Sequence, residues 1–130
     1  MTFEQIKTEI SSRRFQPVYL LMGDEPYFID QLTELLIEKV LPEEEKDFNQ
    51  TILYGMETNV ANVITLARGF PMMSDYQLVV VKEAQGLSKI EELELYVKNP
   101  LKSTVLVINY KNGTIDKRKK LYAECSKQGI

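Results

Sequence analysis

The chain has 130 residues, of which 44% are hydrophobic and 27% are charged, a composition typical of one globular domain. It has no histidine and a single cysteine, Cys125, so an internal disulfide and a histidine-based catalytic triad are excluded, and a zinc site would lack its usual ligands. No apolar stretch approaches the roughly 20 residues that a membrane-spanning helix needs. We expect a cytoplasmic location, where a lone cysteine stays reduced.

The net charge of −3 is distributed unevenly along the chain. Residues 1–97 contain 8 Lys and Arg against 17 Asp and Glu, whereas residues 98–130 contain 8 against 2, so the two parts carry −9 and +6. A solvated helix face is the commoner explanation of such a basic run, and contact with nucleic acid or an acidic partner is the alternative. The run comprises Lys117, Arg118, Lys119 and Lys120.

The first half of the chain alternates between helix and strand patterns. A helix is predicted behind Thr2, which has Gln5 in the capping-box position, and it should end near residues 13–14. Residues 17–22 (PVYLLM) form a continuous apolar run, which is typical of a strand buried on both faces. A second helix should begin at Pro26, and the next strand is predicted over residues 48–54 (FNQTILY). The apolar stripe of the second helix comprises Phe28, Leu32, Leu35 and Leu36.

The second half repeats this alternation. Thr58 is expected to cap a helix, and residues 77–81 (QLVVV) form the clearest strand because they are rich in β-branched residues. Ser88 is expected to cap a further helix, which precedes a strand over residues 104–108 (TVLVI). The helix behind Thr58 has an apolar stripe that comprises Val60, Val63, Ile64 and Ala67.

A turn at residues 112–113 and a helix over residues 115–127 are predicted after the last strand. Strand and helix therefore alternate four times, which predicts an α/β fold with a three-layer parallel sheet. Residues 1–130 are expected to form a single domain. The chain stops just after Gly129, a helix-ending residue behind which another strand is due, so we expect an N-terminal fragment of a longer protein.

The segment GDEPYFID, residues 23–30, has the position of a phosphate-binding loop because ligands of open parallel sheets bind beyond the carboxyl ends of the strands. Such a loop needs glycines, a lysine and a hydroxyl, and only the leading Gly23 is present. Pro26 lacks an amide N–H, and the carboxylates of Asp24 and Glu25 would repel a phosphate. The residues in the places of the second glycine, the lysine and the hydroxyl are Phe28, Ile29 and Asp30.

The end of the third predicted strand also lacks its expected residue. Lys82 stands where a nucleotide hydrolase has the aspartate that holds magnesium. We therefore expect no catalytic residue, no metal and no cofactor. Two alternatives stay open: a P-loop-like NTPase domain, and a receiver-type signalling domain in which Asp24 and Glu25 hold magnesium. The receiver chemistry needs an aspartate nucleophile where Lys82 stands.

Phe70, Pro71, Met72 and Met73 form an apolar run between a predicted helix and a predicted strand, where loops are usually polar. Such a run either fills the edge of the core or forms a binding surface. Methionine suits an adaptable binding surface, and Pro71 restricts the backbone in advance.

Three stretches together carry a resemblance to a known family: PVYLLMGDEPYFIDQL, then ARGFPMMSDYQLVVVKEAQ, then STVLVINYKNGTIDKRKKLY. In this order they resemble the N-terminal domain of the delta subunit of the bacterial DNA polymerase III clamp loader, through nearly the whole chain. The resemblance implies an AAA+/P-loop NTPase-like module with a degenerate phosphate loop, followed in the family by a helical lid and a helical collar. It implies no enzymatic activity for this domain, because the DNA-directed DNA polymerase activity of the holoenzyme belongs to other subunits.

The same resemblance implies partners and a site. In the family, this domain docks on the sliding clamp (beta subunit) through a hydrophobic element that corresponds to residues 70–73, and it helps to open the ring during DNA replication. Some members carry a Leu-Phe pair there, where this chain has Pro71 and Met72. Further implied partners are the gamma/tau and delta prime subunits and, indirectly, primer-template DNA, with no membrane. Residues 117–120 would then contact DNA or a neighbouring subunit.

Overall fold

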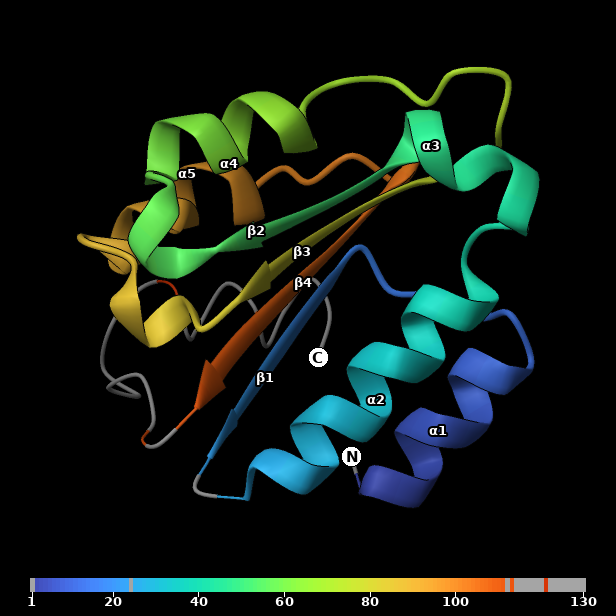
Figure 1. Cartoon of the computed structure of the whole chain (residues 1–130), viewed down its shortest axis with the longest axis horizontal. Coiled ribbons are helices and arrows are strands. Elements are labelled where there is room, and N and C mark those ends of the chain that lie inside the picture. Colours follow the sequence, from blue (N-terminus) through green and yellow to red (C-terminus); the bar gives the residue numbers. More distant parts are fainter. Residues whose placement is uncertain (1, 24, 112, 114–120, 122–130) are drawn as a thin grey trace.

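The computed structural model describes residues 2–23, 25–111, 113 and 121. These residues form a sheet of parallel strands in the order β1-β4-β3-β2 (Figure 1). The strands are β1 (Val18–Gly23), β2 (Gln50–Tyr54), β3 (Gln77–Lys82) and β4 (Thr104–Lys111). Helices cover both faces of the sheet, so the predicted three-layer α/β fold is confirmed.

One face of the sheet is covered by α1 (Phe3–Ser11) and α2 (Pro26–Lys39), which lie side by side (Figure 1). Ile10 and Leu36 from these helices are fully buried, and they share a cluster with Tyr19 of β1. This cluster fixes the position of α2 directly behind the end of β1, at the place where a phosphate loop would lie.

The other face is covered by α4 (Val60–Ala67) and α5 (Glu94–Val97), the second of which follows a 3₁₀ turn at Ile90–Leu93. Leu121, which is helical and fully buried, packs into the same cluster. After α4, the chain passes from this layer back to the amino end of the sheet, where β3 begins (Figure 1).

Neighbouring residues of each central strand contribute to opposite clusters. In β3, Leu78 and Val80 belong to the cluster under α1 and α2, whereas Val79 and Val81 belong to the cluster under α4 and α5. The alternation explains why the strand is apolar at four consecutive positions, Leu78 to Val81, and not at every second one. Burying each such side chain stabilises the fold by roughly 1.5–3 kcal/mol.

Short helical turns make up most of the connections. They are the 3₁₀ turns Glu43–Glu45, Gly55–Glu57 and Ala84–Gly86 and the four-residue helix α3 (Lys46–Asn49). The strand predicted over residues 48–54 begins at residue 50, because its first two residues belong to α3. None of the described helices has the length and apolar character that crossing a membrane would require.

The helix starts were predicted with mixed success. The capping box at Thr2 is confirmed, since Gln5 N donates to Thr2 Oγ1 over 3.2 Å and Thr2 N donates to Gln5 Oε1 over 2.9 Å. Pro26 is the first residue of α2, as predicted. The cap at Thr58 is wrong: Asn59 has the extended backbone of a cap, and its Oδ1 accepts from Asn62 N over 2.8 Å.

Three further expectations are corrected. Ser88 does not cap a helix, because the next helical turn begins at Ile90 and its cap position is Lys89, which has a φ of 56° and makes no side-chain cap bond. Helix α1 ends at Ser11, earlier than predicted, since the left-handed Arg13 turns the chain out of the helix. Phe28 does not enter the core: it is 45% exposed and packs on Phe3, while Ile29 takes the buried position.

Some expectations lie outside the described residues. They are the turn at Asn112, the course of the last helix over residues 115–127 apart from Leu121, and Gly129, Cys125 and Asp24.

Candidate functional site

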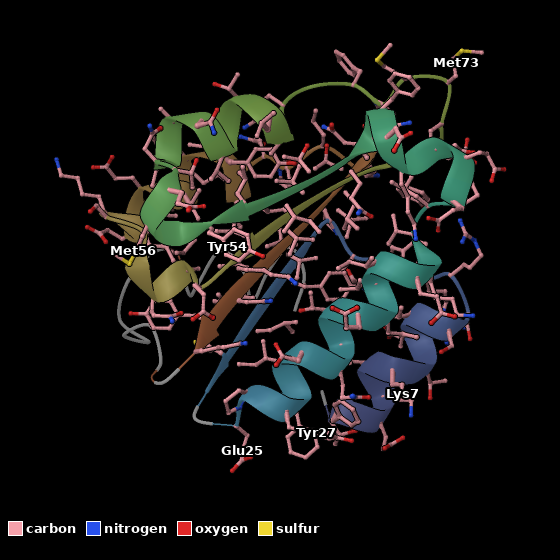
Figure 2. The ribbon with its side chains drawn as sticks, in the orientation of Figure 1. Lys7, Glu25, Tyr27, Tyr54, Met56 and Met73 are labelled. Carbon is pink, nitrogen blue, oxygen red and sulfur yellow. The ribbon has the colours of Figure 1, made fainter. Side chains whose placement is uncertain are left out.

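The apolar run between α4 and β3 projects from the surface and does not fill the core. Phe70 is 78% exposed, Met72 62% and Met73 99%, and Pro71 is half-buried. Figure 2 shows Met73 at the outer end of this loop, with its side chain directed away from the sheet. The alternative that Phe70 and Met73 fill the edge of the core is therefore wrong, and the loop is left as an exposed apolar surface.

The half-buried amide of Gln77 and the buried hydroxyl of Thr104 hold the start of this loop. Gln77 Nε2 donates to Gly69 O over 2.7 Å and to Leu66 O over 2.9 Å. Thr104 Oγ1, from the neighbouring strand, donates to Ala67 O over 2.8 Å. The carbonyls at the end of α4, which have no partner within the helix, are thus bonded to the sheet.

Asn49, at the end of α3, holds the middle of the loop. Met72 N donates to Asn49 Oδ1 over 2.6 Å, and Asn49 Nδ2 donates to Met72 O over 3.0 Å. Beyond it, Met73 has a φ of 54°, a left-handed conformation that costs a non-glycine residue on the order of 1–3 kcal/mol. Such a conformation persists only where the surrounding structure fixes it, so the loop has a defined shape.

The carboxyl edge of the sheet, where a nucleotide would lie, is crossed by ion pairs. Lys111 Nζ, at the end of β4, lies 2.8 Å from Asp30 Oδ1 on α2 and 3.7 Å from Glu83 Oε2 behind β3. The hydrogen bond to Asp30 is the main reason that the pKa of Lys111 is raised; burial opposes the rise, and the charges of Asp30 and Glu83 add to it. Asp30 stands in the place of the magnesium-binding hydroxyl, and here it binds a lysine of the same chain.

The described residues on either side of Asp24 show how β1 passes into α2. Gly23, with a φ of 139°, lies in a conformation that suits glycine, and it pairs with Gly113 through an isolated bridge. Glu25 precedes α2 without a side-chain cap, and Ile29, in the place of the phosphate-binding lysine, is 4% exposed. Within the described part of the chain, no group of three acidic, histidine or cysteine side chains could hold a metal ion.

Sequence reasoning missed two residues beside the apolar loop. Phe48 is 73% exposed, and Asn49 is buried, although both were assigned to a strand. The available signal was Asn49 itself, a polar side chain in a run expected to be buried. The basic residues Lys117, Arg118, Lys119 and Lys120 lie outside the described residues.

The strand order, with β4 between β1 and β3 and helices on both faces, defines a three-layer α/β module with a parallel sheet. The model of the family described as DNA polymerase III, delta subunit, matches residues 19–130, so the chain belongs to this family. The chain is 32% identical to DNA polymerase III subunit delta of Bacillus subtilis (strain 168) over 131 residues, which cover 93% of this chain and 38% of that protein.

Two solved structures are similar. The Bacillus subtilis DNA clamp loader delta protein matches with a TM-score of 0.88 and 27% identity, over 99% of this chain and 41% of its own. A gamma subunit-related protein of DNA polymerase III from Thermotoga maritima matches with a TM-score of 0.57 and 14% identity, over 100% of this chain and 44% of its own, and it shows the fold alone. The chain thus spans about two fifths of the length of these relatives.

Proposed function

We propose that this chain is the part of a clamp-loader delta subunit that binds the sliding clamp in DNA replication, and that it does so without catalysis. The binding site is the loop of Phe70, Pro71, Met72 and Met73. Three large apolar side chains exposed in one short, fixed loop are the observation that carries the proposal. Membership of the delta-subunit family and the likeness to a clamp loader delta protein support it.

The loop can supply the affinity of a reversible protein contact. Fully burying a Phe or Met side chain contributes roughly 1.5–3 kcal/mol. Two or three such side chains contribute several kcal/mol towards the roughly 8 kcal/mol of a micromolar complex, before the costs of ordering are subtracted. Because Asn49 and Gln77 already hold the loop, those costs are reduced.

Helping the ring to open is a further part of the proposal. A partner shifts an equilibrium only by its differential affinity, so this domain must bind the opened clamp more tightly than the closed one. A loop fixed on a rigid α/β module can favour one clamp shape over another, whereas a flexible peptide adapts to both.

In this proposal the domain binds the clamp without binding or hydrolysing a nucleotide. Ile29 is buried in the place of the phosphate-binding lysine, and Lys82 replaces the magnesium-binding aspartate. We expect the other partners to be the gamma/tau and delta prime subunits and, indirectly, primer-template DNA, in the cytoplasm and away from membranes. Residues 117–120 are candidates for the contact with DNA or a neighbouring subunit.

Calorimetric titration of the full-length protein against its cognate clamp tests the proposal. Replacing Phe70→Ala together with Met72→Ala should weaken binding at least tenfold, and Met56→Ala is the matched control. Met56 is 85% exposed and lies far from Met73 in Figure 2. Undiminished binding by the double variant would overturn the site.

A further inference from the structure

Asn49 is a buried side chain whose amide bonds only to the main chain in the hydrogen bonds found for it. It is 4% exposed, and its amide makes two reciprocal bonds with Met72 and one with Glu45, whose carbonyl accepts from Nδ2 over 3.2 Å. The two bonds to Met72 repeat the exchange by which residues of neighbouring antiparallel strands pair. One side chain on α3 therefore holds the backbone of Met72 as a strand would.

The position of this bond within the loop gives it a role in binding. Met72 lies between Phe70 and the left-handed Met73, so the bond fixes the backbone from which all three exposed side chains project. Before the apolar run, Gln77 Nε2 donates to Gly69 O over 2.7 Å. After it, Ser74 Oγ donates to Tyr76 O over 3.0 Å. Of these contacts, the one with Asn49 is made to the centre of the apolar run.

Phe48 precedes Asn49 on α3 and is 73% exposed. Consecutive Cα atoms are 3.8 Å apart, and Met72 N donates to Asn49 Oδ1 over 2.6 Å, so the Cα atoms of Phe48 and Met72 lie within about 12 Å of each other. An exposed phenylalanine at that distance is close enough to contact a partner that covers the loop.

Acidic residues flank Phe48 and the apolar loop along the chain. Glu44, Asp47 and Asp75 are exposed, and the nearby Lys46 is already paired with Glu43 over 3.0 Å. A partner that buries the apolar side chains would bring its own rim against these carboxylates, so a basic rim is complementary.

We propose that α3 and the loop form one binding surface, in which Asn49 is a positioning residue and Phe48 is an additional apolar contact. This α3–loop surface comprises Phe48, Phe70, Met72 and Met73. The inference rests on the proposed function, so its occupant is the sliding clamp, at an apolar pocket with a basic rim. Without the Asn49 amide the loop samples other shapes, and binding has to order it again.

The test measures the affinity of the full-length protein for its cognate clamp by calorimetry, with folding checked by circular dichroism. We expect Asn49→Ala to weaken binding about tenfold, which is about 1.4 kcal/mol. Asn49→Asp keeps the acceptor for Met72 N and loses the donor to Met72 O. The affinity of this variant should therefore lie between that of the wild-type protein and that of Asn49→Ala. Phe48→Ala should weaken binding about five- to tenfold, and because the side chain is exposed this variant folds normally.

A double-mutant cycle separates positioning from general destabilisation. If Asn49 acts through the loop, Asn49→Ala should cost little further affinity in a background that already carries Phe70→Ala and Met72→Ala. An equal loss in both backgrounds would contradict positioning. Tyr27→Ala is the control for Phe48→Ala, since Tyr27 is 62% exposed and lies at the opposite end of the molecule from Met73 in Figure 2.

The outcomes distinguish the two proposals. Wild-type affinity of Phe48→Ala and of both Asn49 variants, with weakened binding by Phe70→Ala plus Met72→Ala, would overturn the inference and leave the proposed function standing. Wild-type affinity of that last double variant would overturn the proposed function itself. Weaker binding at higher salt supports the basic rim, and salt-independent binding contradicts it.

Discussion

Lys111, at the end of β4, binds the carboxylate of Asp30 on α2 over 2.8 Å, across the carboxyl edge of the sheet, where open parallel sheets bind their ligands. The pair joins the last residue of a central strand to the helix that would begin a phosphate site. The Lys111 side chain is 19% exposed and that of Asp30 is 56% exposed. Water therefore screens the pair, and we expect it to contribute modestly to stability.

Replacing Lys111→Met should lower the free energy of unfolding at neutral pH by about 1 kcal/mol or less. The pKa of Lys111 is raised above 10.5, chiefly by the hydrogen bond to Asp30, so the stabilisation is fully present below pH 10.5 and is lost as the pH rises through the raised pKa. Urea denaturation from pH 7 to alkaline pH should show the two proteins converging. Lys82→Met is the control, because Lys82 lies 4.0 Å from Glu34 and should contribute less. A difference that grows with pH would contradict this assignment.

Tyr96 makes a second alkaline prediction. It is fully buried, and its hydroxyl accepts from Leu101 N over 3.1 Å. Tyr96→Phe leaves that N–H without its partner and should cost about 1 kcal/mol at neutral pH.

Burial is the main cause that raises the pKa of Tyr96 above 10.0, although the hydrogen bonds with Leu101 and Thr104 and the charge of Arg68 lower it. Tyr96 ionises at a lower pH in the unfolded protein than in the folded one. The free energy of unfolding of the wild-type protein therefore falls as the pH rises from 10 through the raised pKa, whereas Tyr96→Phe does not lose this contribution. The disadvantage of Tyr96→Phe should therefore shrink at alkaline pH in the same denaturation series. A constant difference would show that Tyr96 does not ionise on unfolding.

The layers of the fold could be predicted because each central strand contains an uninterrupted apolar run, Leu78 to Val81 in β3 and Val105 to Ile108 in β4. A run such as residues 77–81 has one physical solution in a chain of this size, which is a strand covered on both faces. The exposed loop at residues 70–73 could also be singled out, since four apolar residues at a turn need a reason. Its exposure could not, because a core edge satisfies the same composition.

The roles of Phe48 and Asn49 could not be predicted, since they depend on contacts between segments more than 20 residues apart. From the sequence, Asn49 is only a polar residue in a predicted strand. Its role becomes visible with the hydrogen bond that its amide makes to Met72. Phe28 illustrates the same difficulty in reverse. It continues the apolar stripe of α2, yet the packing places Ile29 inward and leaves Phe28 against Phe3.

Ile29 provides a direct test of the expectation that residues 23–30 are a degenerate phosphate loop. It stands in the place of the phosphate-binding lysine but is 4% exposed and packs in the cluster under α1 and α2. Ile29→Lys should therefore fail to create ATP binding and should destabilise the fold by several kcal/mol, because a buried charge lacks water. Denaturation measures the loss, and titration with ATP and magnesium measures binding.

Gln31→Lys, two residues further along α2 at an exposed position, is the control and should be nearly neutral for stability. Saturable ATP binding by the wild-type protein would favour the NTPase alternative over a pure binding role.

Ring opening predicts a difference between two forms of the clamp. If the domain favours the opened shape, a clamp made monomeric by substitutions in its own subunit interface should bind more tightly than the closed ring, because no binding energy is spent on breaking the interface. A tenfold difference in Kd corresponds to about 1.4 kcal/mol, and calorimetry with both forms resolves it. Phe70→Ala plus Met72→Ala should weaken binding to both forms, since the same side chains are buried in each. Equal affinity of the wild-type protein for the two forms would leave the binding site intact and remove the proposed contribution to opening.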